Sequence, residues 1–174
     1  MNVFSKLNHH CSNEALKSII FTLVLLLMSS CSKDCSEGYK GTNCDEQITP
    51  SSITITRVVV QSFPSNISDG LSNNPDIAIK IYNNSNSYGP SNTYFEDAYY
   101  WNSYTFYPNF TMYNAFENTH IELYDYDFIL GTIVDQDYMG GVQGNLYNNQ
   151  NDFPTKVDFD YGSYEFDVYL SYTW

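Results

Sequence analysis

Residues 164–174 read Y-E-F-D-V-Y-L-S-Y-T-W, and this stretch decides the fold. From Tyr164 to Trp174, apolar or aromatic side chains occupy every second position, and mostly polar ones stand between them. Successive side chains of a β-strand point to opposite faces of a sheet, so a period of two indicates a strand with one buried face. Sheets with one buried and one wet face are typical of antiparallel β-proteins.

Further strand candidates recur along the chain at intervals of roughly ten residues, as expected for a sandwich. Residues 76–82 alternate in the same way, with Ile77, Ile79 and Ile81 facing inward and Ala78, Lys80 and Tyr82 facing outward. The other candidates are residues 53–63, 93–101, 103–108, 120–125 and 156–160, together with residues 138–146, which are Gly-rich but suit a strand. Residues 83–93 are a polar loop, and no amphipathic helix of useful length follows residue 31. The sequence therefore predicts an all-β fold, an eight-stranded antiparallel β-sandwich over residues 53–174.

Composition limits the classes of partner. The 174 residues include 7 Lys and Arg against 20 Asp and Glu, which gives a net charge of −13. Nucleic acid is excluded as a partner, because phosphate contacts need clustered basic side chains. Direct attraction to an anionic membrane is disfavoured for the same reason. Aromatic residues make up 17% of the chain, which argues against disorder and suits β-structure.

The amino-terminal segment has the pattern of a secretory signal. Lys6 and Lys17 precede an apolar run, residues 19–28, which is too short to span a hydrocarbon core of ~30 Å as a helix. Residues 27–31, L-M-S-S-C, resemble a bacterial lipobox. The resemblance implies removal of residues 1–30, acylation of Cys31 (palmitate) and a lipidated tether over residues 31–34. An ordinary signal peptide with a free thiol at Cys31 is the alternative.

The resemblance also implies a location. Ser32 after the lipidated cysteine resembles a signal for leaving the inner membrane, and the Ser-Lys-Asp tract partly resembles a surface-export signal. We therefore expect the protein to be lipid-anchored in the bacterial outer membrane. The partial resemblance to an export signal leaves display on the cell surface as one option.

Four cysteines fit this arrangement. Cys11 leaves with the signal and Cys31 carries the lipid, so Cys35 and Cys44 remain as one pair in an oxidising compartment. We expect a disulfide between them. The stretch between them, C-S-E-G-Y-K-G-T-N-C, resembles the last disulfide loop of an epidermal-growth-factor-like (EGF-like) module. It implies a clamp or rigid spacer over residues 35–44, with a receptor-type interaction module as the alternative, followed by a linker over 45–52.

Acidic residues gather around one predicted hairpin. Asp125 and Asp127 lie two apart at the end of a predicted strand, and Asp135 and Asp137 repeat the spacing on the return strand. A period of two sends both members of a pair to one side, where they repel unless a cation or proton lies between them. Carboxylate oxygens at this density suit calcium. The alternative is that these carboxylates are simply solvated and cap turns.

The same residues resemble a known family. Strand, Y-D-Y-D, loop and D-Y-M-G resemble the third calcium loop of the C-two domain, named for the second conserved region of protein kinase C. Asp125, Asp127 and Asp137 match its three acidic positions. Asp69 and the Asn74-Pro75-Asp76 step resemble the first calcium loop, with Asn74 in place of an Asp, so ligation there is weaker or moves to Asp76. The resemblance implies an eight-stranded sandwich with bound calcium at one edge.

A second cluster is aromatic. Trp101, with Tyr99 and Tyr100 beside it, is the best candidate for stacking on a sugar. The alternative is that the rings of residues 94–116 fill the core and cover its edges, where Leu is scarce.

The sequence contains no G-x-S-x-G, H-E-x-x-H or P-loop motif, so we predict a protein that is not an enzyme. A hydrolase using a carboxylate pair is the remaining catalytic alternative. The prediction for function is a lipid-anchored, non-catalytic cell-envelope or surface protein whose calcium-binding sandwich acts as a binding module. Its expected partners are the membrane, through the anchor, and a glycan or another surface protein. The alternative function is a carbohydrate-binding module of a surface glycan-handling system.

Overall fold

The structure is a computed structural model that describes residues 34–65, 74–89, 91, 93–129, 132–148 and 152–174, except for the side chains of Phe128 and Ile129. Residues Cys35–Trp174 form one compact unit. The expected signal peptide, the lipidation site Cys31 and the proposed ligand Asp69 lie outside the described residues. Within the described ranges, no helix has the length and apolar character needed to cross a membrane.

The first large sheet is built around a long hairpin. Its strand order is β10 (Thr132–Asn145), β9 (Asn118–Ile129), β4 (Ile77–Tyr82) and β5 (Ser87–Tyr88), and β6 (Tyr94–Phe95) also pairs with β4. All of these pairs are antiparallel.

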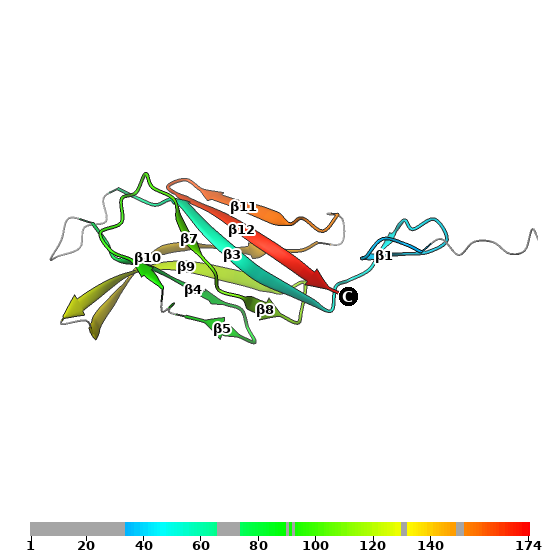
Figure 1. Cartoon of the computed structure of the whole chain (residues 1–174), viewed down its shortest axis with the longest axis horizontal. Coiled ribbons are helices and arrows are strands. Elements are labelled where there is room, and N and C mark those ends of the chain that lie inside the picture. Colours follow the sequence, from blue (N-terminus) through cyan, green and yellow to red (C-terminus); the bar gives the residue numbers. More distant parts are fainter. Residues whose placement is uncertain (1–33, 66–73, 90, 92, 130–131, 149–151) are drawn as a thin grey trace, which may run out of the picture. The chain divides into compact units, whose positions relative to one another are not determined.

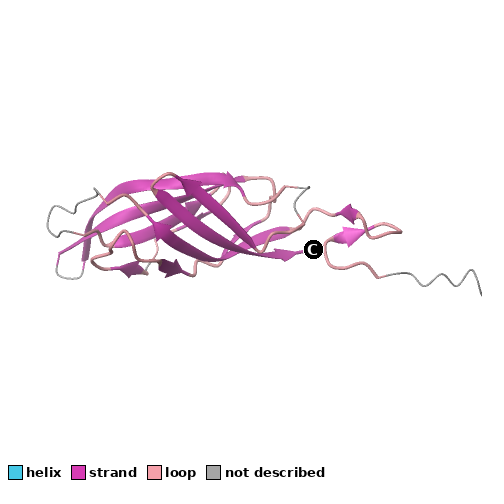
Figure 2. Ribbon diagram, turned by 90° about the horizontal axis from the view of Figure 1, so that it is seen from above, coloured by secondary structure: helices cyan, strands magenta, loops and turns pink. Residues whose placement is uncertain are grey.

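The second large sheet has the order β11 (Lys156–Tyr161), β12 (Tyr164–Thr173), β3 (Ser52–Ser62) and β7 (Tyr104–Phe106), and β8 (Phe110–Met112) also pairs with β3. Two short strands therefore share one edge in each sheet, β5 and β6 along β4, and β7 and β8 along β3. Each sheet is four strands wide, which confirms the predicted all-β, antiparallel arrangement with eight strand positions (Figures 1 and 2).

The core lies between the two sheets and follows the alternation in the sequence. Ile77, Ile79 and Ile81 of β4 are fully buried, as are Val58 and Val60 of β3. On β12, every second residue is buried: Phe166, Val168 and Leu170. Burying one such side chain stabilises the fold by about 1.5–3 kcal/mol relative to leaving it in water, so these rows hold the sheets together.

Four details differ from the predicted strands. The candidate strand 93–101 contains only β6, because the backbone of Asp97 takes a positive φ of 50° that ends the extended run. β5 lies in the stretch expected to be a polar loop. Ala78 is fully buried although it was expected on the wet face, since a side chain this small is easily covered by its neighbours. The linker expected over 45–52 contributes a strand of its own, β2 (Glu46–Gln47).

The disulfide hairpin belongs to the same compact unit as the sandwich. Cys35 and Cys44 form the expected disulfide, and β1 (Tyr39–Lys40) pairs with β2. The Tyr39 hydroxyl donates a hydrogen bond of 2.8 Å to Asp152, and its ring meets that of Phe153 edge-on at 5.5 Å. A Cβ on Gly38 would lie 2.4–2.8 Å from the rings of Phe153 and Trp174. A residue without a side chain is therefore needed where the hairpin packs against the sandwich.

Candidate functional site

The four hairpin aspartates lie inside a strand ladder. β9 continues to Ile129 and β10 begins at Thr132, so the loop expected between Asp127 and Asp137 is mostly paired strand. The expectation that Asp125 ends a strand was wrong. The reason is that the residues between the acidic pairs are largely aromatic and β-branched, and they extend the ladder instead of forming a wide loop.

The register places the carboxylates opposite each other. Asp125 pairs with Asp137, and Asp127 pairs with Asp135. Directly opposite residues of an antiparallel pair point to the same face of a sheet, so all four side chains share one face of the hairpin, defined here as the acidic face. Asp125 is 6% exposed, whereas Asp135 and Asp137 are exposed. Like charges directly opposite one another destabilise a sheet, so this face holds unfavourable electrostatic energy.

One residue of the predicted first loop also reaches this face. The backbone N–H of Asp76 donates a 2.7 Å hydrogen bond to Oδ1 of Asp125. In return, the N–H of Tyr126 donates to the carbonyl of Asp76 over 2.9 Å. Asn74 lies half-buried two residues before Asp76. The fold thus brings the predicted ligands Asp76 and Asp125 together from segments 49 residues apart.

Basic side chains are scarce in the sandwich, and each is engaged elsewhere. Residues 53–174 contain only Arg57, Lys80 and Lys156. The guanidinium of Arg57 lies 3.6 Å from the centre of the Tyr169 ring. The ammonium of Lys80 lies 5.3 and 5.9 Å from two tyrosine ring centres, those of residues 82 and 124. Lys156 contacts the carboxylates of a different hairpin, β11–β12.

The acidic face fits a hard cation by its donor chemistry and by its register. Carboxylate oxygens are the ligands that calcium prefers, and a single face supplies four carboxylates. As the side chains lie, no three Asp, Glu, His or Cys groups of the described residues converge on one point. A bound ion would have to draw in the exposed side chains of Asp135 and Asp137, and Asp135 would have to give up the 2.8 Å hydrogen bond that its Oδ1 accepts from the N–H of Gln136.

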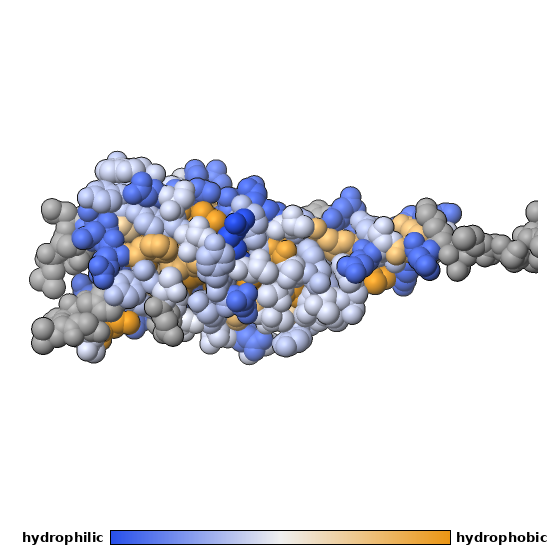
Figure 3. All heavy atoms as spheres, viewed as in Figure 1, coloured by the Kyte–Doolittle hydropathy of each residue, from blue (hydrophilic) through white to orange (hydrophobic). Residues whose placement is uncertain are grey.

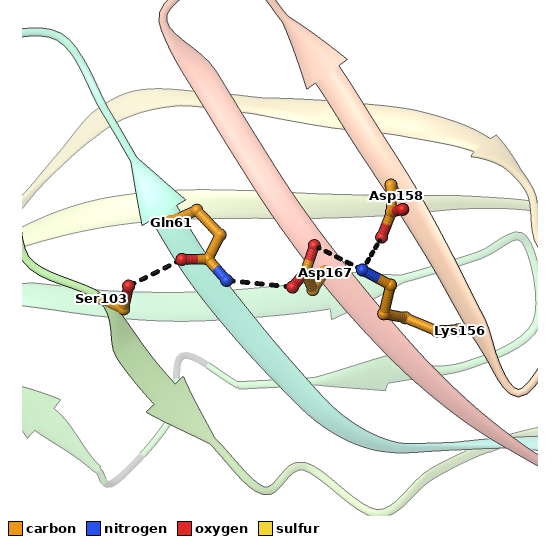
Figure 4. A network of polar contacts seen from close by, with 5 residues as sticks. All are labelled: Gln61, Ser103, Lys156, Asp158 and Asp167. Atoms are coloured by element: carbon orange, nitrogen blue, oxygen red, sulfur yellow. Dashed lines mark hydrogen bonds and ion pairs between the residues drawn. The ribbon is translucent and has the colours of Figure 1, made fainter.

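The β11–β12 hairpin provides a second set of opposed carboxylates. Asp158 pairs with Asp167, and the ammonium of Lys156 lies 2.6 Å from the first and 3.4 Å from the second. Gln61 donates a 2.9 Å hydrogen bond to Asp167 and accepts one of 2.6 Å from Ser103. Figure 4 shows this row of contacts running across β7, β3, β12 and β11.

Protonation of this row follows from its contacts. Burial by itself raises the pKa of Asp167, but the hydrogen bond from Gln61 and the contacts with Asp158 and Lys156 outweigh it, so the pKa lies below its usual value. The hydrogen bond to Asp158 and the attraction of both carboxylates raise the pKa of Lys156, against the opposing effect of burial. The lowered pKa of Asp167 and the raised pKa of Lys156 both favour the ion pair between these two side chains.

The predicted stacking residues form an exposed turn instead of a strand. The N–H of Asn102 donates to the carbonyl of Tyr99 over 3.0 Å, which closes the turn. The side chains of Tyr99, Tyr100 and Trp101 are 43%, 42% and 62% exposed. The Tyr104 hydroxyl fixes the turn, because it accepts from the N–H of Tyr99 over 2.6 Å. We call this segment, residues 99–102, the aromatic turn.

Some of the other aromatic residues fill the core and some are exposed, so they divide between the two interpretations made from the sequence. Phe106 and Phe110 are buried in the core, whereas Tyr107, Tyr113 and Phe116 are at least half exposed. On the face drawn in Figure 3, apolar surface occurs as separate spots among polar residues.

The acidic face and the aromatic turn are joined through one residue. Oδ1 of Asp76 accepts a 2.8 Å hydrogen bond from the N–H of Asp97. The N–H of Ala98 donates to the carbonyl of Pro75 over 2.7 Å. The backbone that leads into the aromatic turn is thus held by the residue whose own N–H is bound by Asp125.

Sequence reasoning missed a third group of residues on the outer face of the first sheet. His120, Glu122 and Tyr138 line a cavity beside Gly141. A signal for it was present, because His120, Glu122 and Tyr124 occupy alternate positions of a predicted strand whose other face is apolar, and two glycines follow on the next strand.

Comparisons with known proteins give the fold relatives of this chain. No protein-family model matches the sequence, and no curated protein is similar to it in sequence. Among solved structures, human GIVD cytosolic phospholipase A2 in complex with methyl gamma-linolenyl fluorophosphonate matches with a TM-score of 0.39 and 9% identity. A second structure of it, with that inhibitor and terbium chloride, matches with a TM-score of 0.38 and 13% identity.

These two matches cover 70% of this chain but span only 16% and 17% of the phospholipase chains. A C-two domain of plant extended synaptotagmin 1 matches with a TM-score of 0.37 and 12% identity, over 72% of this chain and 97% of that one. The C-two domain is also the family that the acidic hairpin resembles. At these TM-scores the likenesses support no conclusion about function.

Proposed function

We propose that the protein is a lipid-anchored, non-catalytic binding module of the bacterial cell envelope, and that calcium binds its acidic face. The observation that carries the calcium proposal is the register of β9 and β10, which opposes carboxylates in two adjacent pairs. No Lys or Arg occurs between Lys80 and Lys156, so the hairpin itself contains neither residue.

The residues that would hold the ion are Asp125, Asp127, Asp135 and Asp137, with Asp76 beside them. Calcium would supply the positive charge that removes the repulsion between opposed carboxylates. A dissociation constant of about 10⁻⁴ to 10⁻³ M suffices outside a cell. Because Asp76 holds the backbone before the aromatic turn, an ion at this face would also stabilise that turn.

The calcium proposal is tested by thermal unfolding of the full chain in chelator and in calcium. At calcium about ten times above the dissociation constant, binding stabilises the fold by about 1.4 kcal/mol. We expect the melting temperature to rise by about 3–7 °C. The double variant Asp125→Asn, Asp127→Asn should lose the shift, and magnesium should give a smaller one.

The chain offers a matched control for this experiment. Asp160 and Glu165 also lie directly opposite each other and are exposed, but they belong to the β11–β12 hairpin. The double variant Asp160→Asn, Glu165→Gln should keep the full calcium shift. An unchanged melting temperature in millimolar calcium, or equal losses in both double variants, would refute binding at the acidic face.

The anchor is proposed from the sequence alone, through the lipobox at residues 27–31. Labelling of growing cells with radioactive palmitate should mark the wild-type protein and leave Cys31→Ala unmarked. Recovery of an unprocessed, unlabelled wild-type protein from the cell interior would contradict both the anchor and the envelope location.

Exposure of the aromatic turn favours a second candidate function, carbohydrate binding at Tyr99, Tyr100 and Trp101. Trp101 is 62% exposed on a turn whose backbone is fixed, and a fixed exposed ring loses little entropy when a ligand stacks on it. Binding on a glycan array that disappears in Trp101→Ala would support this function. An array with no bound glycan would count against it.

A further inference from the structure

A cavity lies on the outer face of the first sheet, on the side of β9 opposite the core. Side chains alternate along β9, so His120 and Glu122 point away from the face that buries Ile121 and Leu123. The cavity measures about 270 Å³ and is lined by His120, Glu122, Tyr138, Gly141, Gln143 and Tyr161. This volume is close to the lower end of small-molecule sites, about 300 Å³.

Gly141 forms the floor of the cavity. Gly141 pairs with Glu122, and a Cβ at this position would lie 2.5 Å from the carbonyl oxygen of Ile121. No larger residue fits there without moving the strands. The register of β10 also shifts between Tyr138 and Gly140, and such bulges re-aim the neighbouring side chain.

A carboxylate is held in place at this floor. The hydroxyl of Tyr82 donates to Oε1 of Glu122 and that of Tyr124 donates to Oε2, each over 2.8 Å. A carboxylate can accept about four hydrogen bonds, so about two positions on Glu122 remain for a ligand. The ring of His120 is held as well, because it stacks on Tyr82 at 4.6 Å with an interplanar angle of 5°.

Two exposed rings form the walls of the cavity. Tyr138 is 61% exposed and Tyr161 is 58% exposed, and they come from hairpins of different sheets. The Tyr161 hydroxyl lies 3.5 Å from the carbonyl oxygen of Gln143, which places its ring at the edge of β10. Aromatic faces presented to solvent beside fixed polar groups suit a ligand with one apolar face and a polar rim.

We propose that this cavity binds a neutral saccharide, one or two sugar rings of a glycan. The C–H face of a pyranose would stack on Tyr138 or Tyr161, and its hydroxyls would donate to Glu122 and exchange hydrogen bonds with His120 and Gln143. An acidic sugar is disfavoured, because the chain carries a net charge of −13 and Glu122 lies at the floor. The site is separate from both the acidic face and the aromatic turn, and it requires no calcium.

The test is calorimetric titration of the full chain, in chelator, with neutral hexasaccharides of glucose, mannose and galactose. We expect one of them to bind with a dissociation constant of about 0.1–1 mM. Tyr138→Ala should weaken this binding by about tenfold, the upper range for one lost aromatic contact. Glu122→Gln should weaken it as well, and Tyr107→Ala, which removes a ring that is 67% exposed outside the cavity, should not.

Four results would overturn the proposal. One is the absence of binding to all three hexasaccharides up to about 10 mM, a free energy too small for a specific site. Another is equal weakening in Tyr138→Ala and Tyr107→Ala. Loss of binding in Trp101→Ala with full binding in Tyr138→Ala would assign the sugar to the aromatic turn instead. Saturation of the cavity by choline but by no sugar would assign a cationic ligand. Unchanged melting of Tyr138→Ala shows that a loss of affinity is not a loss of fold.

Discussion

Two hairpins of this molecule place carboxylates directly opposite one another, and they differ in what compensates the charge. In β11–β12, Asp158 faces Asp167, and Lys156 lies within 3.4 Å of both. Gln61 adds a hydrogen bond to the same row, and the pKa of Asp167 falls below its usual value. This hairpin carries its own counter-charge.

The β9–β10 hairpin has two opposed pairs, and its own sequence includes no Lys or Arg. Asp125 faces Asp137 and Asp127 faces Asp135, and the stretch from residue 81 to residue 155 contains neither Lys nor Arg. One hairpin thus carries a basic residue beside its opposed carboxylates, and the other contains no Lys or Arg. Opposed carboxylates therefore do not by themselves indicate an ion site. A basic side chain beside them indicates a structural contact, whereas a cation taken from solution would make them an ion site.

The largest effect that separates the two hairpins is expected at Asp125. Asp125→Ala removes the buried acceptor of the Asp76 N–H and should lower the free energy of unfolding by about 1–3 kcal/mol. Asp158→Ala, on a side chain that is 64% exposed, should cost less than about 1 kcal/mol. Urea denaturation measures both variants. Asp125→Asn, which keeps an acceptor oxygen, should recover most of the loss, and equal costs at the two positions would erase the distinction.

Removal of Lys156 should make the β11–β12 hairpin resemble the β9–β10 hairpin. Lys156→Ala leaves Asp158 and Asp167 opposed without this cation and should destabilise the fold at low salt, by less than Asp125→Ala does. Addition of about 1 M sodium chloride should reduce this cost, because salt screens partly exposed charges. A cost that is independent of salt would show that Lys156 acts through its packing and not through its charge.

Addition of a basic residue should make the β9–β10 hairpin resemble the β11–β12 hairpin. Asp135→Lys places a cation opposite Asp127 and should raise the free energy of unfolding in chelator by about 0.5–1 kcal/mol. The calcium shift should shrink in this variant, since a ligand has been replaced by a competing charge. Glu165→Lys, at the exposed position opposite Asp160, is the matched control and should keep the shift.

The smallest effect concerns pH. The pKa of Asp167 is lowered in the folded state, so its contribution to stability is present above the usual Asp pKa of about 3.9 and is lost as the pH falls through the folded-state value. The difference in stability between wild type and Lys156→Ala should therefore be constant from pH 5 to pH 8 and decline below about pH 4. Melting curves across this range measure it, and a difference that persists at pH 2 would contradict the electrostatic origin.

The sequence was sufficient for the sheets, because alternation is a local property. On β12, Phe166, Val168 and Leu170 are buried as expected, whereas Tyr164 and Tyr172 are only half-buried. On β4, all three isoleucines are buried as expected. The disulfide also followed from counting cysteines. These features need no knowledge of which strands are neighbours.

The sequence identified the four aspartates of the acidic face, but it placed them at a strand end and around a loop instead of within a strand ladder. The β-branched residues Ile133 and Val134 between the acidic pairs favour a strand, and the expectation of a loop there came from the resemblance to the third calcium loop. The hydrogen bond from Asp76 to Asp125 joins segments 49 residues apart and depends on register. The strand expected up to Trp101 is interrupted at Asp97 by a positive φ, a conformation that sequence patterns indicate poorly for residues other than glycine.

The position of β3 has a mechanical consequence. The chain passes from the disulfide hairpin into β3, which is a central strand, bonded to β12 along one side and to β7 and β8 along the other. Tension applied at Cys35 would enter this strand along its own axis. A pull resisted at the far end of β3 would load both ladders in shear, with many hydrogen bonds strained together. A pull resisted at the carboxyl terminus would instead peel β12 from β3 one bond at a time, because Thr173 pairs with Ser52 at the start of β3.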